Sequence, residues 1–83
     1  MKIQLKYFAS IRETLGQGGE SIETAALTAG ALRDELIARG GAYAQALARG
    51  KAVRLAVDQT MGDETASLRD GAEVAFFPPV TGG

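Results

Sequence analysis

The last residues of the sequence, FFPPVTGG, carry its most distinctive chemical group, a carboxylate that follows two glycines, Gly82 and Gly83. A terminal carboxylate has a pKa of about 3.5, so at neutral pH it is ionised and is a poor electrophile. Reaction at Gly83 would therefore require prior activation, for which an acyl adenylate is the expected form. The activated group could then accept sulfur and become a thiocarboxylate, a soft anionic nucleophile in the way that a thiolate is.

Other candidates for catalysis are scarce, because the 83 residues include neither cysteine nor histidine. The sequence therefore offers no disulfide, no thiol nucleophile, no zinc-thiolate site and no imidazole base. We expect the chain to bind no metal and no cofactor of its own. Any general base or substrate pocket should then belong to a partner.

Charge and hydropathy narrow the classes of partner. The net charge is −1, and the nearest approach to a basic cluster is Arg49, Lys51 and Arg54, which we interpret as a solvated face. Nucleic-acid binding would need more lysine and arginine on one surface. The N-terminus has no signal-peptide pattern, and no segment is long enough to span a bilayer. We expect a cytoplasmic protein that binds neither nucleic acid nor membrane.

The first half of the chain predicts two strands and a short helix. Residues 2–8 alternate between polar and apolar, as in a half-buried strand. Ser10 and Glu13 have the spacing of a capping box, so we expect a short helix that Gly16 ends. Residues 20–27 fit an edge strand, because they contain few large apolar residues.

The best-defined helix is predicted to start at Thr28, which is a suitable N-cap. Leu27 and Leu32 occupy the two positions of a hydrophobic staple, and glycines at 40–41 should end the helix. Its apolar stripe should consist of Leu32, Leu36 and Ile37. A shorter helical stretch should follow at residues 42–49.

The second half predicts the remaining strands. Residues 52–59 should bury Val53, Leu55 and Val57, residues 58–64 should form a turn or a short edge strand, and residues 73–77 should form the last strand. In that strand Val74 and Phe76 should point inward, leaving Glu73, Ala75 and Phe77 outside. The order predicts one α+β domain, residues 1–83, with a mixed four- to five-stranded sheet on one main helix.

Three large apolar side chains fall outside this predicted core. Phe8 ends the first strand, Phe77 ends the last, and Met61 lies in the turn between. If the first and last strands are parallel neighbours, Phe8 and Phe77 meet at the same end of the sheet. Singly exposed apolar residues are common, but three together favour a surface for a partner protein.

The two prolines that follow Phe77 should direct the tail away from the sheet. Pro78 and Pro79 cannot donate a ladder hydrogen bond, and each keeps the preceding residue extended. At roughly 3.3 Å per residue, residues 78–83 can reach about 20 Å, and the terminal glycines suit a narrow channel. A bare Gly-Gly end alone is more typical of a frayed terminus than of a functional one, and the residues around it favour function.

The sequence resembles the ubiquitin-like sulfur carriers, and in particular the family of molybdopterin synthase small subunits. The resemblance covers essentially the whole chain and depends on DGAEVAFFPPVTGG at 70–83, VDQT at 57–60 and KYFASIRE at 6–13. It implies the β-grasp (ubiquitin-like) fold. The Phe-Phe-Pro-Pro approach separates this family from the thiamine-pathway carrier. Asp58 departs from the asparagine that relatives often have, which leaves a hydrogen bond of that turn in doubt.

The resemblance also implies a reaction sequence and partners. A ubiquitin-activating-like adenylyltransferase would use ATP to adenylate Gly83, and a sulfur donor protein would convert it to the thiocarboxylate. The large catalytic subunit of the synthase would receive the tail in its active site, where sulfur passes to a cyclic pyranopterin precursor, within a heterotetramer. Phe8, Met61 and Phe77 would line the contact. The residues expected to insert are Pro78, Pro79, Val80, Thr81 and Gly82.

Three alternatives remain open from the sequence. The chain could be a ubiquitin-like modifier joined through Gly83 to lysine amines, or a sulfur carrier for thiamine synthesis or tRNA thiolation. It could also be a binding module whose tail has no role. The identity of the activating enzyme and sulfur donor, and molybdenum against tungsten as the final metal, are not encoded in these residues.

Overall fold

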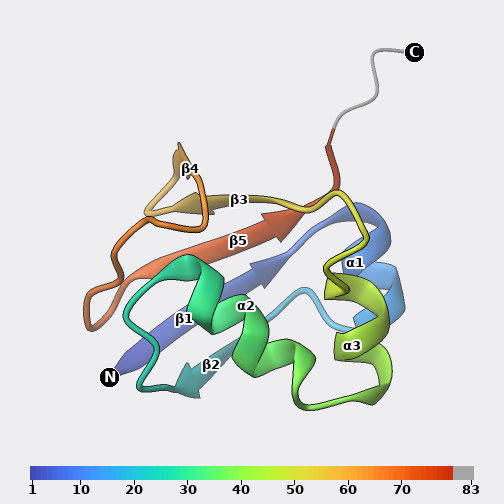
Figure 1. Cartoon of the computed structure of the whole chain (residues 1–83), viewed down its shortest axis with the longest axis horizontal. Coiled ribbons are helices and arrows are strands. Elements are labelled where there is room, and N and C mark those ends of the chain that lie inside the picture. Colours follow the sequence, from blue (N-terminus) through green and yellow to red (C-terminus); the bar gives the residue numbers. More distant parts are fainter. Residues whose placement is uncertain (80–83) are drawn as a thin grey trace.

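Two parallel strands form the centre of the sheet. The structure, a computed structural model, describes residues 1–79. Strand β1 (Lys2–Tyr7) pairs in parallel with β5 (Glu73–Phe77), although the two are the first and last strands of the chain. The strand order is β2-β1-β5-β3-β4 (Figure 1). The mixed sheet with adjacent first and last strands is therefore as predicted.

The remaining strands are antiparallel to their neighbours. Strand β2 (Gly19–Glu23) pairs with β1, and β3 (Arg54–Val57) pairs with β5. Strand β4 (Thr60–Gly62) has three residues and forms the opposite edge beside β3. The edge strand predicted for residues 20–27 thus ends at Glu23, well before the main helix.

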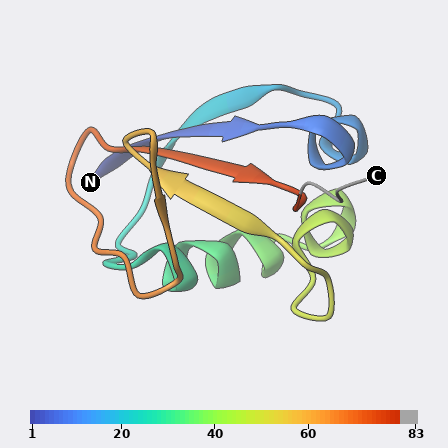
Figure 2. The ribbon, with the colours of Figure 1, turned by 90° about the horizontal axis from the view of Figure 1, so that it is seen from above.

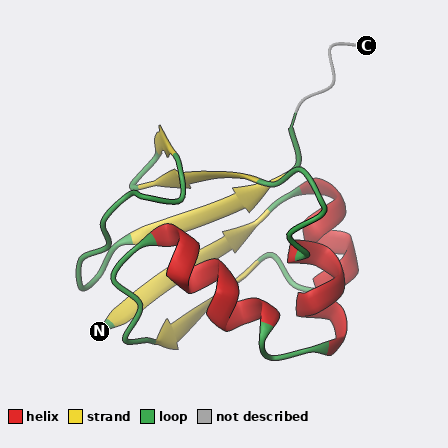
Figure 3. Cartoon of the chain, in the orientation of Figure 1, coloured by secondary structure: helices red, strands yellow, loops and turns green. Residues whose placement is uncertain are grey.

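One helix covers the sheet and two shorter helices close its end. Helix α2 (Ala29–Ile37) lies along one face, as Figures 1 and 2 show. Helices α1 (Ala9–Leu15) and α3 (Gly41–Leu47) lie together at the end of the sheet where β5 finishes (Figures 1 and 3). None of the helices among residues 1–79 is both long and apolar enough to cross a bilayer.

Helix α2 begins after Thr28, as predicted. The hydrophobic staple predicted for α2 and the capping box predicted for α1 are not formed. The Thr28 hydroxyl accepts a hydrogen bond from the Ala31 amide at 3.1 Å. Leu27, the expected staple residue, is 72% exposed, because its backbone instead pairs with Leu68, whose amide donates to the Leu27 carbonyl. Ser10 is not a cap either, since β1 continues directly into α1 and Phe8 occupies the N-cap position without a side-chain bond.

Every second residue of the central strands β1 and β5 points into the core. Tyr7 and Phe76 are partners in the β1–β5 register, both are buried, and their rings stack with centroids 6.5 Å apart. The other large apolar side chains that the two strands and α2 bury belong to the same core cluster. They are Ile3, Leu5, Val74, Leu32 and Leu36.

Burial departs from the prediction in two places. Ala75 is outside the core cluster, as predicted, but it is buried all the same, because β5 is an inner strand and Ala75 lies between Lys6 of β1 and Ala56 of β3. Val53 and Val57 were expected in the core but are only half-buried, since β3 lies beside the short edge strand β4. Leu55 is buried as predicted.

A polar cluster links the closing helices to the edge of the sheet. The Glu20 carboxylate accepts hydrogen bonds from the hydroxyls of Tyr7, at 2.9 Å, and Tyr43, and from the Gln17 amide at 3.0 Å. Arg39 forms an ion pair with Glu20 at 3.4 Å and lies over the Tyr43 ring. Burial alone would raise the pKa of Glu20, but hydrogen bonds from the two tyrosines and the charge of Arg39 outweigh it, so the pKa is lowered. Burial and the neighbouring carboxylate raise the pKa of Tyr7, which therefore remains a neutral donor.

We predict that Glu20→Gln lowers the free energy of unfolding by about 1 kcal/mol at neutral pH, because a charged acceptor binds these donors more strongly than an amide does. The folded pKa of Glu20 lies below the unfolded value of about 4.3. Its contribution is therefore complete above that value and is lost as the pH falls through the folded pKa. Urea unfolding at a series of pH values should show the difference between the two proteins shrinking in acid. Glu13→Gln, on the exposed side of α1, is the control, and a difference that persists unchanged to low pH would contradict the assignment.

Candidate functional site

The outer face of the sheet, opposite α2, brings the predicted aromatic residues together. In the parallel register Tyr7 lies beside Phe76, so the next residues, Phe8 and Phe77, are neighbours. Successive side chains of a strand point to opposite faces, and with Tyr7 and Phe76 buried, Phe8 and Phe77 face outward. Phe77 is in turn the partner of Arg54 on β3.

Met61 belongs to the same face. It is the partner of Ala56, which pairs with Ala75, so small side chains lie between Met61 and the aromatic residues. Phe8 is 47% exposed, Met61 is 57% exposed and Phe77 is half-buried. We call Phe8, Met61 and Phe77 the outer patch. The outer patch thus presents large apolar side chains beside the small Ala56 and Ala75, and aromatic residues and methionine are enriched in protein interfaces.

A strained two-residue turn places Met61 on this face. Asp58 and Gln59 connect β3 to β4 with φ values of 50° and 68°, the conformation of a type I′ turn, which asparagine and glycine prefer. The Asp58 carboxylate accepts a hydrogen bond from the Glu73 amide at 3.0 Å, and the Asp58 amide donates to the Glu73 carbonyl at 2.8 Å. Asp58 therefore ties the turn to β5 through its carboxylate and its backbone.

The structure describes the start of the predicted tail, Pro78 and Pro79, which we call the tail root. Strand β5 ends at Phe77, and the half-buried Pro78 and Pro79 leave the sheet at the end that α1 and α3 close (Figure 1). Pro78 lies against a small cavity between these two helices. The other predicted tail residues lie outside the described residues: Val80, Thr81, Gly82 and Gly83.

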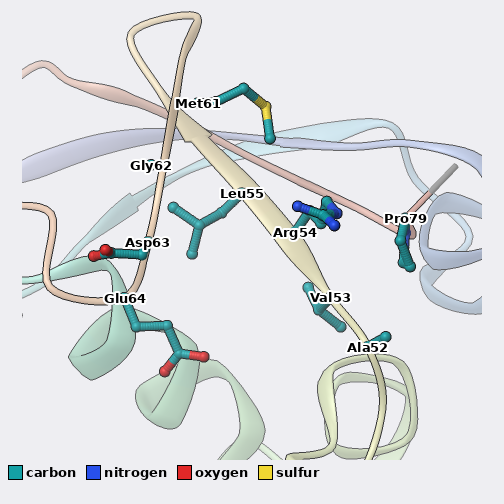
Figure 4. Close-up of a pocket in the computed structure, with 9 residues that line it drawn as sticks. All are labelled: Ala52, Val53, Arg54, Leu55, Met61, Gly62, Asp63, Glu64 and Pro79. Atoms are coloured by element: carbon teal, nitrogen blue, oxygen red, sulfur yellow. The ribbon is translucent and has the colours of Figure 1, made fainter.

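Next to the tail root is a groove that the sequence analysis missed. Its volume is about 430 Å³, and it lies between β3, β4 and Pro79 (Figure 4). Apolar atoms of Val53, Leu55 and Met61 line it, and Arg54 is at its rim. One feature of the sequence could have indicated the groove. The acidic segment after Met61 is short, which is typical of an edge strand that cannot pair along the whole of its neighbouring strand.

A cluster of ion pairs holds the wall of this groove. Buried Arg33 on α2 donates to the carbonyls of Leu47 and Ala48, each at 2.8 Å, and to the Glu64 carboxylate at 2.9 Å. Arg49 also binds Glu64, and it binds Asp34 at 2.8 Å. Hydrogen bonding from Arg49 lowers the pKa of Glu64.

This cluster extends the sequence analysis in two ways. Arg49, Lys51 and Arg54 are all exposed, as expected of a solvated face, but the Arg49 guanidinium also joins α2 to the loop after β4. Arg33 was overlooked, although a charged residue next to Leu32 and three before Leu36 lies at the border of the apolar stripe. Gly30 allows the close approach, since a Cβ there would meet Glu64 at 3.0 Å.

Comparison with known proteins gives consistent matches. Residues 5–83 match the ThiS family. Over 81 residues the chain is 42% identical to the molybdopterin synthase sulfur carrier subunit of Escherichia coli and 38% identical to that of Haemophilus influenzae, covering 98% of this chain and 99% of each relative.

A solved structure shares the fold. It is a protein–protein complex of subunits 1 and 2 of the molybdopterin-converting factor from Helicobacter pylori, and the matching chain gives a TM-score of 0.69 at 23% identity. The match covers 100% of both chains. The β-grasp fold implied by the sequence is therefore confirmed.

We predict that Gln59→Gly raises the free energy of unfolding by about 0.5–1 kcal/mol. A left-handed backbone costs a residue with a Cβ about 1–2 kcal/mol, and part of the gain is offset by the greater chain entropy of glycine. The matched control is Gln4→Gly in β1, where the backbone is ordinary strand and the same change should destabilise by a similar amount. Denaturant unfolding measures both, and equal losses for the two variants would contradict the role of turn strain.

Proposed function

Because the chain belongs to the ThiS family, we propose that it is the sulfur carrier subunit of a molybdopterin synthase. Two nearly full-length relatives with this function support the proposal. The structural observation that carries it is the position of the outer patch, since Phe77 is both a patch residue and the last residue of β5 before the tail. A partner that covers the patch is thereby next to the root of the tail.

The tail is the proposed reactive element. An adenylyltransferase of the ubiquitin-activating type would join the Gly83 carboxylate to the α-phosphate of ATP and release pyrophosphate. Sulfur from a donor protein would displace AMP and leave the thiocarboxylate. In the large subunit, that sulfur would attack a carbon of the cyclic pyranopterin precursor and displace an oxygen substituent. Hydrolysis of the resulting thioester would leave the sulfur on the precursor and return Gly83 to a carboxylate.

Each part of the chain has a separate task in this proposal. The outer patch binds the large subunit, and Pro78 and Pro79 keep the departing chain extended. From there Val80, Thr81 and Gly82 carry Gly83 into the partner's active site, within a reach of about 20 Å. General bases and the substrate pocket belong to the large subunit. The assembly is a cytoplasmic heterotetramer in this proposal.

The first test is chemical. The chain is incubated with activating enzyme, ATP and a sulfur donor, and its intact mass is measured. We expect one terminal oxygen to be replaced by sulfur, and we expect deletion of Gly83 to abolish both this change and precursor conversion without altering the thermal unfolding temperature. Amide-linked adducts on other proteins, or full activity of the deletion variant, would overturn the proposal.

The second test concerns the outer patch. We expect Phe77→Asp to weaken binding to the large subunit by roughly 10- to 100-fold, because burying an aromatic side chain contributes about 1.5–3 kcal/mol. Leu27→Asp is the matched control, since Leu27 is equally apolar and more exposed but lies before α2, away from the patch. Calorimetric titration measures both variants, and undiminished affinity of Phe77→Asp would refute the patch assignment.

A further inference from the structure

The groove beside the tail root is a second binding site. We propose that it receives an extended segment of the large subunit that carries an apolar side chain, which enters the groove, and one carboxylate, which binds Arg54. This inference rests on the proposed function, because it takes the large subunit as the protein that covers the outer patch. It goes beyond that function by assigning a specificity residue outside the patch and the tail.

The groove exists because β4 stops early. The β3–β4 register ends with Leu55 opposite Gly62, and after Gly62 the chain turns away toward α2. Arg54, the first residue of β3, therefore pairs with β5 on one side and has no strand partner on the other, and Val53 precedes the strand. Figure 4 shows Arg54 and Pro79 on one side of the resulting hollow and Asp63 and Glu64 on the other.

The charges around the groove favour an anionic group on the partner. Glu64 is bound by Arg33 and Arg49. Asp63 accepts hydrogen bonds from the amide of Thr65, at 2.8 Å, and from its hydroxyl. Arg54 is exposed, and no ion pair or side-chain hydrogen bond within residues 1–79 involves it. Glu64 is therefore offset by two arginines, Asp63 keeps its negative charge, and the guanidinium of Arg54 is the cation that remains for one carboxylate of a partner.

The same arrangement argues for a protein segment over a phosphate or nucleic acid. The groove has one arginine, Arg54, without an ion pair among residues 1–79, and the charge of Asp63, which also lines it, would disfavour a ligand with several negative charges. The floor is apolar, formed by Val53, Leu55 and Met61, and it suits a side chain. A volume of about 430 Å³ has room for one or two side chains of a peptide.

The groove is continuous with both the outer patch and the tail, and this indicates that the large subunit is the protein that occupies it. Met61 belongs both to the outer patch and to the groove, and Pro79 belongs both to the groove and to the tail. A partner that covers the patch and receives the tail must therefore pass along the groove. Arg54 lies between these two contacts as the register partner of Phe77.

The experiment measures affinity for the large subunit at low and moderate salt. We expect Arg54→Ala to weaken binding about tenfold at low salt and to reduce the salt dependence, and we expect Arg54→Glu to weaken it further. Arg54→Lys, which keeps the charge, should retain part of the affinity. The control is Arg69→Glu, at an exposed arginine in the loop before β5, which should bind as the parent chain does. Thermal unfolding of all variants checks the fold.

The outcomes separate this inference from the proposed function. If Phe77→Asp weakens binding while Arg54→Ala and Arg54→Glu do not, the groove assignment is wrong and the proposed function stands. If neither position matters, the patch assignment fails as well. If the Arg54 variants slow thiocarboxylate formation but bind the large subunit normally, the occupant belongs to the activating enzyme and the inference is overturned.

Discussion

The parallel pairing of β1 with β5 is the constraint on which the rest of the molecule depends. This register stacks Tyr7 on Phe76 inside the core and sets Phe8 beside Phe77 on the opposite face. A slip of one residue would reverse both outcomes, because it would move every side chain of a strand to the other face. Because Tyr7 and Phe76 are buried, Phe8 and Phe77 must lie on the opposite face. The tail begins where β5 ends.

The inner and outer faces of the sheet have different roles. The inner face carries α2 and most of the core, while the outer face has small residues at its centre and the outer patch around them. The helices support the outer face indirectly. Arg33 joins α2 to the end of α3 and, through Glu64, to the loop that follows β4, so the wall of the groove is held by buried charge-assisted hydrogen bonds. Removing one partner of such a network leaves a buried charge without compensation.

The alternation of polar and apolar residues along the strands was the most informative property of the sequence. It predicted which residues of β1 lie inside, and it placed Phe8 and Phe77 together once the strands were taken as parallel neighbours. Features that depend on contacts between distant segments were not predictable. The capping role of Ser10 failed because the β1 backbone runs straight into α1. The hydrogen bonds of Arg33 and the groove at Arg54 depend on how segments far apart in the sequence pack together. Local sequence patterns do not predict such packing.

The central claim is that the outer face, and not the helical face, is covered when the tail reaches its partner. Nuclear magnetic resonance of the chain, with labelled phenylalanine rings and methionine and leucine methyl groups, tests it during titration with the large subunit. We expect the signals of Phe8, Phe77 and Met61 to shift together and to saturate at one equivalent, while the exposed Leu27 methyl groups stay unchanged. Shifts concentrated at Leu27 and α2, with the outer patch unaffected, would contradict the account.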